Sequence, residues 1–240
     1  MGSYPTVVDW DGNGKNSLLA GSGLGGVYVF KNIGTNPDGT PILGDRTEVL
    51  NAAQTGPRAT PVMIDWNGDG YQDILAGNLA GNIKIFTNDG SSNFSFSSNL
   101  QVNGADYDIG SRSAPRIYDW NSDGLNDILV GEYSGYVHYL QNAGTNSAPS
   151  FNTSERLLLM DGTALRYYDP LNPNAAPRSR LDIADWNNDG NPDMLVGGAD
   201  GRVMLFTAAP EPVASTLFLV GSGVFGLWGL RKKIRAGHNE

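Results

Sequence analysis

The stretch that decides the fold is DWNGDGYQDILAGNLAGNIKIF, residues 65–86. Gap-free counterparts occur at residues 9–30, 119–140 and 185–206 of the 240-residue chain. All four copies share the pattern D-W-[DN]-x-[DN]-G-x-x-[DS]-[ILM]-L-[AV]-G, and their starts are 56, 54 and 66 residues apart. A period of this length indicates one supersecondary unit per copy. The chain is therefore expected to consist of four similar units.

Each copy has the pattern of short strands joined by tight turns. In the second copy, residues 73–77 form an apolar run and residues 83–86 alternate between apolar and polar, as strands do. Weaker strands are expected in the spacers, at residues 47–50, 94–102 and 151–160. Four strands in about 55 to 65 residues is the size of one propeller blade. The sequence predicts an all-β propeller of four blades over residues 1–208, either complete or part of a larger ring.

Four of the five tryptophans fall at the second position of the copies. A large apolar side chain at a fixed repeat position is typical of a blade core, and a ligand-binding cage is the alternative. These residues are Trp10, Trp66, Trp120 and Trp186. We expect them in the core.

An acidic nine-residue loop separates the first two strands of each copy, at residues 9–17, 65–73, 119–127 and 185–193. Oxygen-bearing side chains stand at loop positions 1, 3, 5 and 9, and position 6 is always Gly, which permits a sharp turn. Ca²⁺ takes six to eight oxygen ligands, and alternate residues of a curled loop direct their side chains to a common centre. The expected ligands in the last three loops are Asp65, Asn67, Asp69, Asp73, Asp119, Asn121, Asp123, Asp127, Asp185, Asn187, Asp189 and Asp193.

The first loop departs from the others. It retains Asp9, Asp11 and Asn13, but Ser17 replaces the Asp at position 9. With one carboxylate fewer, it is expected to bind Ca²⁺ more weakly. Asp, Asn and Gly also occur in ordinary turns, but four such loops at one repeat position favour metal binding. The chain is expected to hold three to four Ca²⁺ ions.

Composition excludes several classes of function. The chain has no Cys and only two His, so thiolate or imidazole metal sites and a Ser-His-Asp triad lack their residues. The net charge is −9, and it is −11 up to Pro210, where 12 Lys and Arg face 23 Asp and Glu. So acidic a body repels phosphate backbones, which argues against nucleic acid as a partner.

Further motifs support a family resemblance. NIGT at residues 32–35 and NAGT at 142–145 follow the third strand of two copies. A proline stands four residues before three of the loops (Pro5, Pro61 and Pro115), and Leu181 replaces it in the fourth copy. Together with the acidic loops, residues 4–208 resemble FG-GAP or VCBS-type repeats. The resemblance implies a β-propeller with a Ca²⁺ loop between the first two strands of a blade.

The C-terminal segment, residues 209–240, has three parts. PEP at 210–212 precedes an uncharged apolar stretch at 213–230 and a basic cluster at 231–235. The stretch is long enough for a transmembrane helix with its basic end in the cytoplasm, and a buried helix of the propeller is the alternative. The segment resembles a PEP-CTERM sorting signal through Pro210, Glu211, Pro212, Arg231, Lys232, Lys233 and Arg235.

That resemblance implies an exosortase-like partner and a Gram-negative cell envelope. The protein would be anchored transiently in the inner membrane through the C-terminal helix and then exposed at the surface or secreted. Residues 1–5 are not an export signal, and the first copy lacks the Arg-x-x-Pro lead-in found at 58–61 and 112–115. We therefore expect a truncated or mis-started reading frame, with further sequence upstream.

Three functions compete at this point. The leading one is a Ca²⁺-stabilised surface or matrix module that binds polysaccharide or protein without catalysis. A polysaccharide lyase or hydrolase is the alternative, although no residue stands out as catalytic, and a purely structural matrix component is the third. Candidate bases outside the loops are Asp106, Asp108, Glu132 and Asp169.

The longest spacer, residues 151–182, is the expected ligand-binding loop, and a plain surface loop is the alternative. Insertions between blade strands project from one face. Its notable residues are Arg166, Tyr167, Tyr168, Asp169 and Pro170.

Overall fold

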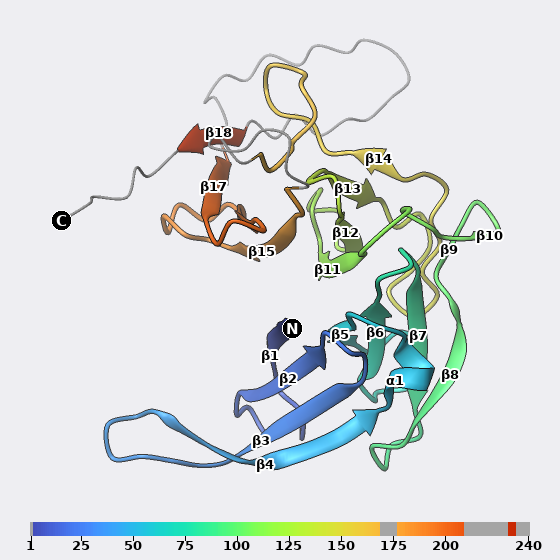
Figure 1. The fold of residues 1–240 in the computed structure, drawn as a ribbon, viewed down its shortest axis with the longest axis vertical. Coiled ribbons are helices and arrows are strands. Elements are labelled where there is room, and N and C mark those ends of the chain that lie inside the picture. The colour runs from blue at the N-terminus through green and yellow to red at the C-terminus, as the bar shows by residue number, and fades with distance from the viewer. Residues whose placement is uncertain (1, 169–176, 209–229, 234–240) are drawn as a thin grey trace.

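The computed structural model describes residues 2–168, 177–208 and 230–233. Four antiparallel four-stranded sheets follow one another around a common centre, and the first strand of each lies nearest that centre (Figure 1). Within the described residues, the helical content is α1 (Ala52–Thr55), a single turn with an Asn51 cap. The protein is an all-β, four-bladed propeller, as the repeats predict.

Each blade is a meander in which neighbouring strands are consecutive in the chain. The first blade contains β1 (Ser3–Val8), β2 (Ser17–Ser22), β3 (Val27–Thr35) and β4 (Pro41–Leu50). The second contains β5 (Thr60–Ile64), β6 (Asp73–Gly77), β7 (Ile83–Asn88) and β8 (Phe94–Asn99). The third contains β11 (Ala114–Tyr118), β12 (Asp127–Gly131), β13 (Val137–Leu140) and β14 (Glu155–Arg156). The fourth contains β15 (Arg180–Ala184), β16 (Asp193–Gly197), β17 (Val203–Ala208) and β18 (Leu230–Lys233). A small hairpin, β9 (Gln101–Val102) with β10 (Ala105–Asp106), lies between blades two and three.

The hydrophobic core lies between consecutive blades. One cluster joins buried residues of the second and third blades, including Leu75, Ile83 and Ile128. The motif glycine that ends the second strand allows this close packing. A Cβ on Gly77 would stand 2.4 Å from the Ser113 carbonyl oxygen of the next blade. Only a residue without a side chain therefore lets the next innermost strand approach.

The repeated tryptophans are covered by the following blade. The Trp10 and Phe94 ring centroids are 5.7 Å apart, and Trp66 stacks on Phe151 at 6.2 Å. Trp120 is buried in the cluster shared with the fourth blade. Trp186, by contrast, is 60% exposed. The expectation of a core position is wrong for Trp186, because no described residue of a following blade covers it.

The C-terminal segment differs from expectation where it is described. Leu230, expected at the end of the helix, and residues 231–233, expected in the basic tail, form β18. Arg231 pairs with Thr207 of β17. The predicted transmembrane helix at 213–230 lies outside the described residues apart from Leu230, and so do the PEP motif at 210–212 and Arg235. In the part of the chain that is described, no helix has the length and apolar character needed to span a membrane.

Candidate functional site

The acidic loops connect the first two strands of the blades, and their first Asp organises each turn. The Asp65 carboxylate accepts hydrogen bonds from the backbone N–H groups of Asp69 at 3.2 Å and Gly70 at 3.0 Å. The Asn67 side-chain amide donates to Asp69 Oδ2 at 2.8 Å. Carboxylates at the head of the other three loops accept the same pair of backbone bonds; they belong to Asp9, Asp119 and Asp185.

The Asp at position 9 also has a structural role, because its carboxylate links the loop to the end of the third strand through hydrogen bonds. Asp73 is fully buried, and its carboxylate accepts hydrogen bonds from the backbone N–H groups of Trp66 at 3.0 Å and Asn88 at 2.8 Å. Asp127 is bound in the same way and also accepts a hydrogen bond from the Tyr139 hydroxyl at 2.9 Å. Position 9 therefore stabilises the blade in addition to its predicted role as a ligand.

The negative charge of the second and third loops has no counterion among the described residues. Burial raises the pKa of Asp73, and the nearby charges of Asp69 and Asp65 raise it further. Burial likewise raises the pKa of Asp127, with a smaller contribution from Asp123. No Lys or Arg of the described residues forms an ion pair with a carboxylate of loops 65–73 and 119–127. Mutual repulsion of this kind favours a bound cation.

The first loop balances its charge within the protein. Lys31 Nζ lies 2.9 Å from Asp11 Oδ1. The next two copies have Thr87 and Gln141 at the repeat position of Lys31. Ser17 takes over the structural bond of position 9, because its Oγ accepts a hydrogen bond from the Asn32 backbone N–H at 3.0 Å.

The donor chemistry of the second and third loops fits Ca²⁺. Each offers three carboxylates and one amide oxygen, the hard ligands that this ion prefers. Their side-chain oxygens are engaged by the loop's own N–H groups, and no group of three Asp, Glu, His or Cys side chains among the described residues forms a preassembled metal centre. In each loop, the position 1 carboxylate is hydrogen-bonded to the backbone of positions 5 and 6. Coordination of an ion by these residues stays a prediction.

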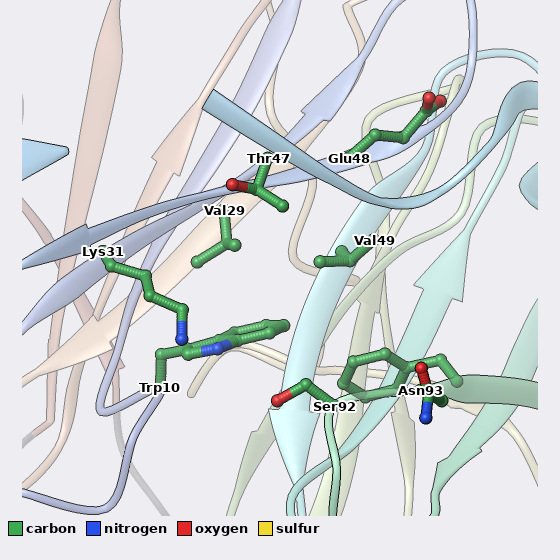
Figure 2. Close-up of a pocket in the computed structure, with 9 residues that line it drawn as sticks. Trp10, Val29, Lys31, Thr47, Glu48, Val49, Ser92 and Asn93 are labelled. Carbon is green, nitrogen blue, oxygen red and sulfur yellow. The ribbon is translucent and has the colours of Figure 1, made fainter. Parts of the chain in front are cut away.

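A cavity of about 420 Å³ opens between the first and second blades (Figure 2). The Trp10 ring lies across it from Val29, Thr47 and Val49, and Lys31 stands at one side. The indole nitrogen of Trp10 is buried and has no hydrogen-bond partner in the described structure. The remaining lining residues are Glu48, Ser92, Asn93 and Phe94.

Comparisons with known proteins fit this geometry. The family described as FG-GAP-like repeat matches residues 65–130 and 119–196, more than half of the chain when taken together. The chain belongs to the FG-GAP-like repeat family. The matched segments contain the second, third and fourth acidic loops, so the FG-GAP resemblance inferred from the motifs is confirmed.

This FG-GAP chain is also similar to curated integrin alpha-3 proteins. It is 25% identical over 181 residues to those of Cricetulus griseus and Mus musculus, a match that covers 69% of this chain and 16% of each relative. A solved structure concerning recognition of non-reducing terminal N-acetylglucosamine by an Agrocybe aegerita lectin has a TM-score of 0.47 and 20% identity. That likeness covers 85% of this chain and 48% of the lectin chain.

The described acids that were considered for catalysis in the FG-GAP chain each bond to separate local groups. The Glu132 carboxylate is buried and accepts hydrogen bonds from two backbone N–H groups of its own turn, at 2.6 and 3.0 Å. Asp106 accepts bonds from neighbouring amide side chains, and Asp108 from the backbone of Gly110. Asp169 lies outside the described residues. Those interactions are local and structural.

Part of the predicted ligand-binding loop is buried in the hydrophobic core. Tyr167 is fully buried between the third and fourth blades, and its hydroxyl donates to Asp200. Arg166 Nε donates to the Ser134 carbonyl oxygen at 2.8 Å. Tyr168 is 38% exposed, whereas residues 169–176, with Asp169 and Pro170, lie outside the described part. A binding role for Tyr167 is therefore wrong, because its side chain packs between blades.

Sequence reasoning missed two features. One is the free indole nitrogen of Trp10, which no pattern could reveal. The other is that three arginines, each seven residues before a loop, lie near one another. The Arg-x-x-Pro lead-ins include two of them. Their shared offset was the available signal, although it does not indicate that the three side chains meet. They are Arg58, Arg112 and Arg178.

Proposed function

We propose that this FG-GAP-like propeller is a non-enzymatic binding module that Ca²⁺ stabilises outside the cell. The observation that carries the proposal is the carboxylate charge of loops 65–73 and 119–127, which no described Lys or Arg pairs with. An unfolded chain has no formed site, so metal binding adds directly to the free energy of unfolding. The FG-GAP resemblance supports the same ion in the same loops.

The ligand we propose is a polysaccharide, with a protein as the second candidate. Support comes from the cavity between the first two blades, where aromatic faces of Trp10 and Phe94 adjoin polar groups of Lys31, Thr47 and Asn93. Apolar surface with a few polar groups is typical of small-ligand sites. The chain spans 16% of the length of the integrin alpha-3 relatives. Their similarity therefore supports an extracellular binding module but no particular ligand.

Calcium dependence is tested by thermal unfolding in excess Ca²⁺ and in excess EDTA. For three sites well above saturation, the melting temperature is expected to rise by about 10 °C or more in Ca²⁺. Mg²⁺ is the control ion, because it binds poorly to large, flexible oxygen sites. Equal melting temperatures in Ca²⁺ and EDTA would exclude the calcium proposal.

Ligand binding is tested on a glycan array with Trp10→Phe, which keeps an aromatic side chain but removes the indole N–H. Lower binding than wild type is expected, with Trp66→Phe as the matched control in the next blade. Unchanged glycan binding by Trp10→Phe would show that the cavity next to Trp10 is not the ligand-binding site. New reducing or unsaturated ends on any bound glycan would favour the lyase or hydrolase instead.

We further propose that residues 209–240 act as a sorting signal processed by an exosortase-like enzyme in a Gram-negative envelope. Support is the sequence of the segment, PEP at 210–212 before an apolar stretch and a basic cluster. Processing would also remove β18 from the fourth blade. The intact mass of protein recovered from its native envelope is expected to lack this segment, and a full-length mass would contradict the proposal.

A further inference from the structure

Three arginines share an unusual backbone conformation at equivalent places. Arg58, Arg112 and Arg178 have φ angles of 60°, 60° and 53°. Left-handed backbone is uncommon for residues other than Gly and is strained. Each arginine lies just before the innermost strand of its blade, opposite the end that carries the acidic loop. A five-residue strand separates the two ends by about 16 Å.

A cavity of about 330 Å³ lies at this arginine end, between the first and fourth blades. Arg58 donates from its guanidinium group to the Tyr4 hydroxyl at 3.0 Å. The Arg180 guanidinium carbon lies 4.8 Å from the Tyr4 ring centroid, and the same group donates to the Arg112 carbonyl oxygen at 3.2 Å. The remaining lining residues are Gly2, Arg178, Gly197, Gly198 and Ala199.

The positive charge of this arginine cluster (Arg58, Arg112, Arg178 and Arg180) has no counterion in the described residues. Three of its nitrogen atoms, Nε and one terminal nitrogen of Arg112 and Nε of Arg178, are buried without a hydrogen-bond partner. Burial lowers the pKa of Arg112, and the charges of Arg178 and Arg58 lower it further. The Arg112 guanidinium stacks on the Tyr133 ring, 4.8 Å from its centroid. At the cavity itself, the unpartnered atom is therefore Nε of Arg178. Adjacent guanidinium charges without a counterion favour a bound anion.

A carboxylate suits the arginine cluster best. Planar guanidinium groups bind carboxylates through paired hydrogen bonds. Tyr4 offers an aromatic face, and Gly197 and Gly198 leave one wall as bare backbone. The volume is at the lower end of the range for small-ligand sites. The acidic loops lie farther away than the Debye length of about 8 Å, so their charge is largely screened.

We propose that this cavity binds a carboxylate-bearing sugar, namely a uronic acid unit of an acidic polysaccharide. The inference rests on the proposed glycan-binding function and adds the chemical class of the ligand. Arg178 and Arg180 bind the carboxylate, and the Tyr4 ring contacts the sugar.

Titration calorimetry with glucuronate and galacturonate, against glucose and galactose as neutral partners, tests the proposal. The uronates are expected to bind at least about tenfold more tightly than the neutral sugars. Arg178→Gln and Arg180→Gln are expected to weaken uronate binding at least about tenfold. Arg46→Gln is the matched control, because Arg46 also stacks on a tyrosine, Tyr28 at 4.7 Å, but lies on outer strand β4. It is expected to bind like wild type.

Several outcomes would overturn the proposal. They are equal binding of uronates and neutral sugars, an equal loss in Arg46→Gln, and inorganic sulfate that binds as tightly as uronate. An acidic peptide that binds where uronate does not would assign the cavity to a protein partner instead. If the glutamine variants do not fold, Arg178→Lys keeps the charge without the planar group, and a uronate-induced rise in the melting temperature of wild type gives a second measurement. Neutral glycans bound on the array without any uronate binding would leave the proposed function standing and exclude this inference.

Discussion

The loop at residues 9–17 and the loops at 65–73 and 119–127 make the same turn but balance their charge differently. In all three, the first Asp accepts two backbone hydrogen bonds and position 6 is a Gly with positive φ. The first loop has Ser17 and the Lys31–Asp11 ion pair, whereas the other two have a buried Asp at position 9 and no ion pair with a described Lys or Arg. The structural role of position 9 is therefore separable from its proposed role in metal binding.

Neutralising one carboxylate of the third loop should have the largest effect on the Ca²⁺-dependent part of the free energy of unfolding. Asp123→Asn is expected to remove about 3 kcal/mol of the stabilisation by Ca²⁺, roughly the contribution of one ion at a hundredfold excess over its dissociation constant. Asp11→Asn, which also removes one carboxylate but at position 3 of the first loop, is expected to leave the calcium-dependent part of the stability unchanged. Urea unfolding of each variant in Ca²⁺ and in EDTA measures the Ca²⁺-dependent part of its free energy of unfolding. An equal loss of Ca²⁺-dependent stability in the two variants would mean that the first loop also binds the ion.

Converting the first loop into the type of the other two should add a site. The double variant Ser17→Asp with Lys31→Gln restores the position-9 carboxylate and removes the internal cation. One more Ca²⁺ ion per chain is expected by titration calorimetry, because the loop then has the donor set of its neighbours. Lys31→Gln alone is the control. An unchanged stoichiometry in the double variant would show that the ligand set is insufficient.

The reverse change should weaken an existing site. Thr87→Lys places an ammonium group at the repeat position of Lys31 beside the second loop. A nearby positive charge is expected to lower the Ca²⁺ affinity of that loop by about tenfold, an effect that salt reduces. Thr87→Gln, which matches the side chain of Gln141, serves as the neutral control. Equal Ca²⁺ affinity of the two variants would show that a positive charge at residue 87 does not weaken the site.

The smallest effect is expected from the Lys31–Asp11 ion pair itself. Both side chains are partly exposed, and such pairs contribute less than about 1 kcal/mol. Lys31→Gln in EDTA should therefore lower the free energy of unfolding by no more than this amount, as measured by urea unfolding. A larger loss would show that Lys31 stabilises the cavity next to Trp10 as well.

Much of the fold was predictable because its signals are local and repeated. The acidic loops, the strands that flank them and the four-blade organisation follow from patterns within each copy. Position 9 was assigned only as a ligand, since its bonds to Asn88 and Asn142 depend on where the third strand ends. Tyr167 was assigned to a ligand loop, because nothing in its neighbourhood indicates that a turn of the fourth blade lies beside it.

By itself, the sequence determined the number of repeats, their strand order and the residues of the acidic loops, because hydrogen bonds and side-chain alternation within one blade involve near neighbours. Tertiary structure decided what happens between blades. It buried Trp10 and Trp120 but exposed Trp186, and it brought together arginines from three repeats. Those outcomes depend on how each blade is rotated against the next, which packing across the whole propeller sets and no single repeat encodes.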